Sequence, residues 1–226
     1  MGKNFLKEWK LKLSDMSIYA AIEIALFILG VCSQYVSRRY DNNLPLGTLM
    51  AALSVGFILL LGFLFDFYMG FHLAVSYGKT RKNFLLSVLP TYVSYGFLFA
   101  VTIKLLLELE TILWRILGEG KLLEWPYDTY ASVGWLLLYA ILLTGLSVSM
   151  GTIICRFKTK GAVALLIIWI LLLFMERFGL VSKGEIEKSV LGFFTWNPGI
   201  QAGVFLAAGM LLCLVPFWGL RNAQVN

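Results

Sequence analysis

Six stretches of the chain are apolar over lengths that can cross a bilayer, and polar or charged residues separate them. A membrane-spanning helix needs about 20 such residues. The pattern therefore predicts an all-α integral membrane protein in which residues 1–226 form a single transmembrane domain. The six predicted spans cover residues 17–36, 46–70, 85–107, 131–155, 161–178 and 199–219.

Residues 2–14, ahead of the first span, alternate between two faces instead of being apolar throughout. Phe5, Trp9 and Leu13 recur every four residues, and lysines take the opposite face. Such a segment lies in the membrane surface, with its apolar side among the acyl chains and its lysines toward anionic headgroups. The pattern predicts an N-terminal interfacial helix.

The two long connections also carry apolar residues. Residues 108–130 place leucines and isoleucines at helical spacing beside several aromatic residues, which predicts an interfacial helix on the outer side. Residues 183–198 begin with charge, turn apolar and end at Asn197-Pro198. There we expect a short re-entrant or surface helix.

Composition excludes a soluble protein. Of the 226 residues, 59% are hydrophobic and 14% are charged, and the mean hydropathy is +0.81. Soluble domains carry about 25% charged residues. Six spans leave roughly 100 residues outside the bilayer, which is too few for a catalytic or ATP-hydrolysing domain.

The formal charge of +6 is interpreted as orienting the chain in the membrane and not as a sign of nucleic-acid binding. With the N-terminus inside, eleven Lys and Arg residues fall in inner segments and eight fall outside. The bias predicts that both termini are cytoplasmic. The inner basic residues are Lys3, Lys7, Lys10, Lys12, Lys79, Arg81, Lys82, Arg156, Lys158, Lys160 and Arg221.

The sequence lacks the residues that a catalytic or metal-binding site would require. With one histidine, His72, the chain cannot build a histidine-based metal site or a catalytic triad of its own. The Gly-Lys-Thr at residues 78–80 imitates a phosphate-binding loop, but Leu73 stands where the first glycine belongs and a membrane helix precedes it. We expect neither an enzyme nor a metal or cofactor bound by this chain.

Ionisable residues inside membrane spans are the usual functional candidates, because a buried charge needs a partner or water. Glu23 lies in the first span, and Asp66 and His72 follow late in the second. Glu23 can reach inner water, pair with a cation from another helix, or line a pathway. Solvation or pairing at the inner surface is the simpler interpretation for Asp66 and His72. Lys104 can extend to the outer surface or pair with Glu108 one turn on.

Small residues four positions apart let helices approach closely, within the chain or between subunits. Such positions occur in the fourth and sixth spans, at Gly145, Ser149, Gly151, Gly199 and Gly203.

The order of these features resembles the permease subunits of type V ABC exporters. The resemblance is carried by an amphipathic entry helix, six spans, a paired-glycine fourth span followed by a basic turn, and Asn197-Pro198 before the last span. A further match is the stretch between the second and third spans, Gly78, Lys79, Thr80, Arg81, Lys82, Asn83 and Phe84.

In that family the first inner loop forms a coupling helix that docks on a separate ATPase subunit. The resemblance thus implies that residues 78–84 contact an ABC ATPase, which holds ATP and Mg²⁺, and that a second permease copy completes the pathway. It also makes Asn197 and Pro198 candidates for the pathway or its gate, beside Glu23, which is a candidate because it is an acid within a span. Short members without large outer domains resemble bacterial plasma-membrane exporters of, or immunity factors against, amphipathic peptides.

Two other functions fit the same pattern. The substrate-binding membrane subunit of an energy-coupling-factor importer has a similar length and span number, and a membrane immunity protein that transports nothing is a third. The charged interfacial helix and the basic first inner loop favour the exporter.

Overall fold

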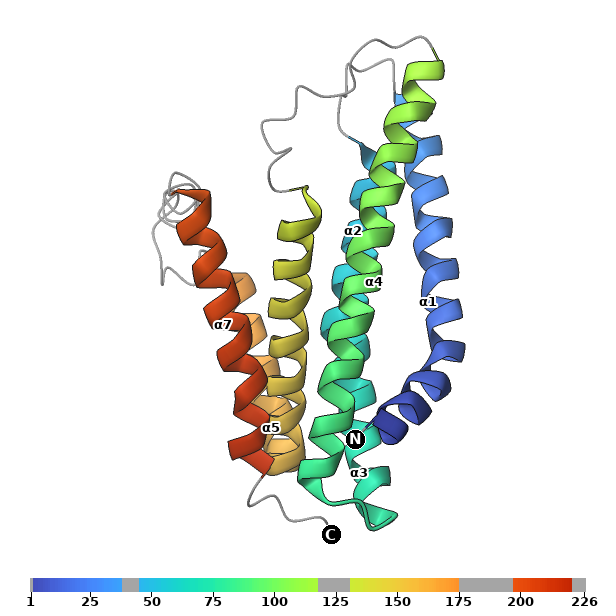
Figure 1. Ribbon diagram of the computed structural model, residues 1–226. Coiled ribbons are helices and arrows are strands. Elements are labelled where there is room, and N and C mark those ends of the chain that lie inside the picture. The colour runs from blue at the N-terminus through green and yellow to red at the C-terminus, as the bar shows by residue number, and fades with distance from the viewer. Residues whose placement is uncertain (1, 38–44, 118–130, 175–196, 221–226) are drawn as a thin grey trace.

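The computed structural model describes residues 2–37, 45–117, 131–174 and 197–220, with side chains placed except at 2–16, 37, 172 and 173. These residues form helices and no strand (Figure 1). Five of the helices are long and apolar enough to cross a membrane. The all-helical membrane fold is confirmed at this level, whereas the number six and the sidedness stay predictions.

The predicted interfacial helix and first span are one continuous helix, α1 (Gly2–Ser37). Its spanning part is Ser17–Val36, in agreement with the predicted 17–36. Figure 1 shows the first turns, in dark blue, inclined to the rest of the helix. The N-terminal segment is therefore helical, and its direction changes near the start of the span.

The second span consists of α2 (Leu46–Phe57), the π-helical turn η2 (Ile58–Gly62) and α3 (Phe63–Ser76). Together they make a 31-residue apolar helix, six residues longer at its C-terminal end than the predicted 46–70. A π-turn accommodates one extra residue and is frequent at functional sites.

Helix α4 (Arg81–Ile116) contains the predicted third span and continues well beyond it. Residues 108–116 belong to this helix, so the prediction of a separate outer helix beginning at residue 108 is wrong for that part. Continuous helical spacing of leucines and isoleucines with no breaking residue explains the extension. Residues 118–130, the remainder of that prediction, lie outside the described residues.

Helix α5 (Val133–Phe174) contains most of the predicted spans 131–155 and 161–178 as two limbs. Residues 175–178 of the second lie outside the described residues. The backbone at Lys158 is not helical, with φ 52° and ψ −134°. A Cβ atom at Gly161 would lie 2.7 Å from the carbonyl oxygen of Ile153, although eight residues of straight helix separate their ends by about 12 Å. The chain therefore reverses at Lys158.

Helix α7 (Pro198–Gly219) contains the last predicted span. It runs parallel to the first limb of α5, since Gly209 meets Ile141 and Gly219 meets Thr152. The predicted outer helix at 183–198 lies outside the described residues except at its last two positions.

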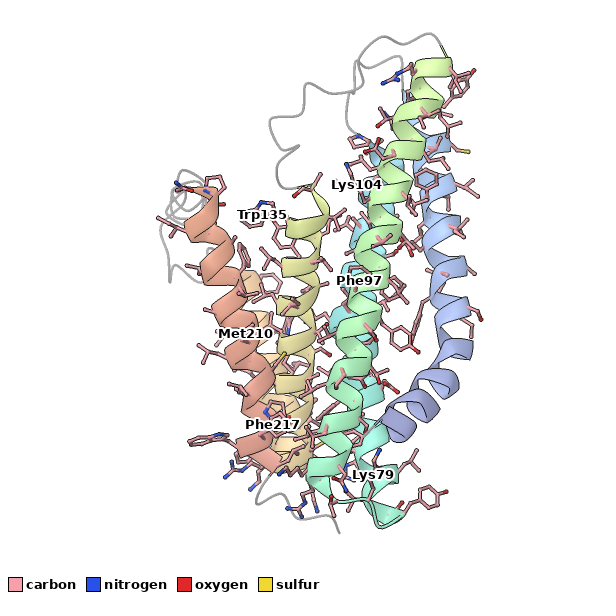
Figure 2. All side chains as sticks on the ribbon, viewed as in Figure 1. Lys79, Phe97, Lys104, Trp135, Met210 and Phe217 are labelled. Carbon is pink, nitrogen blue, oxygen red and sulfur yellow. The ribbon has the colours of Figure 1, made fainter. Side chains whose placement is uncertain are left out.

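The core lies where α3, α4 and the first limb of α5 meet, and aromatic side chains fill it. The α3–α4 turn, the Lys158 reversal and the end of α7 lie at one end of the molecule with the start of α1 (Figure 1). Figure 2 places Lys79 at this end, and Lys104 and Trp135 toward the opposite one. The structure thus groups the segments that the charge count assigns to the inner side.

Candidate functional site

The connection between α3 and α4 is a tight turn. Gly78 has φ 77°, its N–H donates to the carbonyl of Val75, and the N–H of Lys79 donates to the carbonyl of Ala74, each at 2.9 Å. This pair of bonds is the Schellman arrangement, which requires a left-handed residue and so favours glycine. Gly78 ends α3 and reverses the chain toward α4.

Thr80 starts the next helix. Its hydroxyl accepts a 3.3 Å hydrogen bond from the N–H of Asn83, which is the usual role of a helix N-cap. Arg81, Lys82, Asn83 and Phe84 are consequently the first turn of α4. The short coupling helix that the resemblance implies is not a separate element in these residues.

Two side chains of the turn are anchored to α4. The Lys79 ammonium donates to Ser87 Oγ at 2.8 Å and lies 6.0 Å from the centroid of the Phe84 ring. Phe84 is buried against Phe67 and Phe71 of α3, with ring centroids 5.4 Å and 5.7 Å away. The turn is therefore held rigidly on the core.

Arg81 connects the turn to α7. Its Nη1 donates a 3.0 Å hydrogen bond to the carbonyl oxygen of Leu220, the C-cap of that helix. A cation at a helix C-terminus also complements the helix dipole. Lys82 and Asn83 are exposed at the same end. The basic turn thus contacts α3, α4 and α7 and leaves Lys82 facing outward.

Glu23 is buried between α1 and α4, with 1% of its surface exposed. The hydroxyl of Thr102 lies 3.0 Å from Glu23 Oε1, and among the described residues Thr102 is its sole hydrogen-bonding partner. Within those residues no basic group lies at ion-pair distance from Glu23. Pairing with Lys79, Arg81 or Lys82 is therefore absent from this structure.

The other ionisable residues of the spans have neighbours of their own. The Tyr92 hydroxyl donates to Asp66 Oδ2, and the His72 ring packs edge-on against Tyr68 at 4.8 Å. Lys104 pairs with Glu108 at 2.9 Å, which confirms that alternative for Lys104.

Asn197 and Pro198, the gate candidates, start α7. Asn197 Oδ1 accepts from the N–H of Gly199 at 2.9 Å, and Pro198 occupies the first turn, where its missing N–H costs nothing. Both are exposed. A helix cap accounts for this Asn-Pro pair without any further role.

The small residues of α5 lie at helix contacts. A Cβ atom at Gly145 would meet the carbonyl of Gly209 at 2.9 Å, and one at Gly151 would meet Phe67 at 2.7 Å. The Ser149 hydroxyl donates to the carbonyl of Leu212 at 2.7 Å.

Helix α7 packs against α5 through a different face from the one that Gly199 and Gly203 mark. No described atom outside the local helix lies within 4 Å of a Cβ at Gly203, and at Gly199 such an atom meets only the Asn197 cap. Gly209 and Gly219 are the α7 glycines that lie against α5. The four-residue stripe was an insufficient guide because small residues occur on both faces of this helix.

Glu110 is a residue that sequence reasoning missed. It is fully buried, and its carboxylate accepts hydrogen bonds from Gly47 N at 3.1 Å, Thr48 N at 2.7 Å and Thr48 Oγ1 at 2.6 Å. Gln34 Oε1 accepts the neighbouring N–H of Leu46 at 3.1 Å. The N-terminus of α2, whose N-cap Pro45 offers no side-chain oxygen, is capped by α1 and α4.

An apolar pocket of about 130 Å³ lies between α2, η2, α4 and the first limb of α5. Small residues create it, among them Ala52, Gly56 and Gly96. Within the described ranges, no group of three His, Cys, Asp or Glu residues could hold a metal ion.

The fold and these contacts define a helical protein of the membrane-spanning class. No family model matches the chain, and neither does any curated protein or solved structure.

Proposed function

We propose that the chain is the permease subunit of an ABC exporter in a bacterial plasma membrane. In this proposal a separate ATPase subunit, which carries ATP and Mg²⁺, docks on the basic turn at residues 78–84. A second copy of the permease or a related chain completes the pathway. The cargo is an amphipathic or hydrophobic peptide.

The observation that carries the proposal is the way the basic turn is built into the bundle. Lys79 is anchored on Ser87, Phe84 is buried against α3, and Arg81 donates to the end of α7. A partner that moves this turn therefore moves three helices together. A surface that only anchored the inner end in lipid headgroups would not need the bond from Arg81 to the α7 carbonyl.

Variants of Lys82 and Arg81 can distinguish binding of the ATPase from transmission of its movement to the helices. Lys82 is exposed and has no partner among the described residues, so Lys82→Glu should weaken binding of the ATPase about tenfold, equivalent to about 1.4 kcal/mol. Lys160→Glu makes the same charge change at an exposed position of the neighbouring inner turn and should leave binding nearly unchanged.

Arg81→Gln removes the cation and weakens the bond to Leu220 while the turn itself is kept. The ATPase should still bind, but peptide-stimulated ATP hydrolysis should fall. The measurement is co-purification in detergent followed by an ATPase assay with candidate peptides. If no ATPase accompanies the wild-type chain, or if Lys82→Glu binds as tightly as wild type, the exporter proposal fails.

A further inference from the structure

We infer that Glu23 is held in the membrane as a neutral carboxylic acid and forms a proton-binding site between α1 and α4. This inference concerns a site that the proposed exporter function does not use. It rests on the hydrogen atoms that the observed contacts require.

Thr102 makes two contacts with one hydroxyl hydrogen. Its Oγ1 lies 2.9 Å from the carbonyl oxygen of Phe99 and 3.0 Å from Glu23 Oε1. A carbonyl oxygen and an ionised carboxylate are both acceptors only, and a threonine hydroxyl has a single hydrogen to donate. If Glu23 were ionised, the single hydroxyl hydrogen would face two acceptors. Either it would bond one of them and leave the other opposite the hydroxyl oxygen, or both would share it in weak hydrogen bonds.

A protonated Glu23 satisfies both contacts. Thr102 then donates to the Phe99 carbonyl within its own helix, and the carboxylic acid of Glu23 donates its proton to the free lone pair of Thr102 Oγ1. Each of the two contacts then joins one donor to one acceptor. No charge is then buried.

In the part of the chain that the structure describes, the Thr102 hydroxyl is the one group placed to stabilise an anion at Glu23. Glu23 is 1% exposed, and α2 and η2, which pack beside α1, contain no charged residue. On α4, Lys104 pairs with Glu108, and Glu110 is bonded to Gly47 and Thr48.

The remaining titratable groups are at other positions. Arg81 and Lys82 begin α4 and Arg115 is near its end, and Asp66 on α3 accepts from Tyr92. Tyr19, one turn before Glu23 on α1, places its hydroxyl close to Gly62. Because none of these is an ionic partner of Glu23 in the described residues, charge on this carboxyl would be uncompensated.

Glu110 provides the contrast within the same chain. It is equally buried but accepts three hydrogen bonds from two N–H groups and a hydroxyl at a helix N-terminus, where negative charge is favoured. The two acids therefore differ in their supply of donors. Glu23 is offered one hydroxyl that already has another acceptor.

Infrared spectroscopy of the full chain in membranes at pH 7 tests the inference directly. The difference spectrum of wild type minus Glu23→Gln should contain the carbonyl band of a protonated carboxylic acid. Thr102→Val should move that band to higher frequency, because the acid loses its acceptor. Glu108→Gln, an exposed acid paired with Lys104, should remove carboxylate bands and leave the acid band in place.

Carboxylate bands alone in the Glu23→Gln difference would overturn the inference. Failure of Glu23→Gln to fold would also count against it, since a neutral amide of the same shape should replace a neutral acid and donate to Thr102. An acid band that Thr102→Val does not move would contradict the proposed bond. The readout needs neither an ATPase nor transport, so it stands or falls independently of the exporter proposal.

Discussion

Glu110 on α4 and Thr48 on α2 are joined twice, through the Thr48 N–H at 2.7 Å and its hydroxyl at 2.6 Å. Three N–H groups at the start of α2 have no partner within the helix, those of Leu46, Gly47 and Thr48, and this carboxylate together with Gln34 bonds all three. A helix that begins at a proline without a capping side chain thus acquires its cap from two other helices.

Removing this carboxylate should destabilise the bundle. Glu110→Ala leaves three buried donors unbonded, which we expect to cost about 2–4 kcal/mol. Thermal unfolding in detergent measures the effect. Glu108→Ala removes the exposed acid two residues earlier and should cost less than about 1 kcal/mol; equal losses in the two variants would contradict the capping role.

The contact between α5 and α7 makes a second prediction. Gly145→Val should lower the melting temperature, by the equivalent of about 1–3 kcal/mol, because its Cβ would lie 2.9 Å from a backbone oxygen of α7. Gly203→Val places the same side chain where no described atom lies within 4 Å. It should be nearly neutral, and a comparable loss there would show that Gly203 packs against something after all.

The reversal inside α5 carries backbone strain at one residue. Lys158 has φ 52°, a region that costs a residue with a Cβ atom about 1–2 kcal/mol. Lys158→Gly should therefore stabilise the protein by about 1 kcal/mol. Lys160→Gly, two residues after the reversal, changes a residue whose φ and ψ are helical. It should lack this gain, so only Lys158→Gly is expected to raise the melting temperature.

Sidedness can be measured with single cysteines. In a variant lacking Cys32, Cys155 and Cys213, Lys79→Cys and Lys158→Cys should react with impermeant reagent only from the cytoplasmic side, as the bias in basic residues predicts. Lys121→Cys, in the predicted outer connection, should react from outside. Labelling of Lys79→Cys from outside intact cells would reverse the topology and exclude docking of a cytoplasmic ATPase there.

Hydrophobic length was enough to locate the described spans, since long apolar stretches admit few other structures in a bilayer. The turn at Gly78 was also predictable, because its causes are local in the sequence: a glycine, and two residues later a threonine that caps the next helix. The ends of α4 could not be predicted, because an amphipathic sequence does not show whether a helix stops at the membrane surface or continues past it.

The contacts between helices escaped prediction for a different reason. Glu110 and Glu108 look alike in the sequence, and their difference arises from α2, more than sixty residues away. Glu23 was identified as unusual, but its partner Thr102 lies 79 positions further on. Spacing along one helix contains no information about which side chain of another helix faces it.

The π-turn Ile58–Gly62 divides the second span into two phases. One additional residue rotates everything that follows by about 100° relative to an unbroken α-helix. With that rotation, one series of residues spaced by four stays buried along the whole span: Ala51, Val55, Leu59, Phe63, Phe67 and Phe71. Deleting one residue from this turn would rotate α3 relative to α2 and turn the phenylalanines away from Phe84 and Tyr92. Substitution within the turn should consequently be tolerated far better than a change of its length.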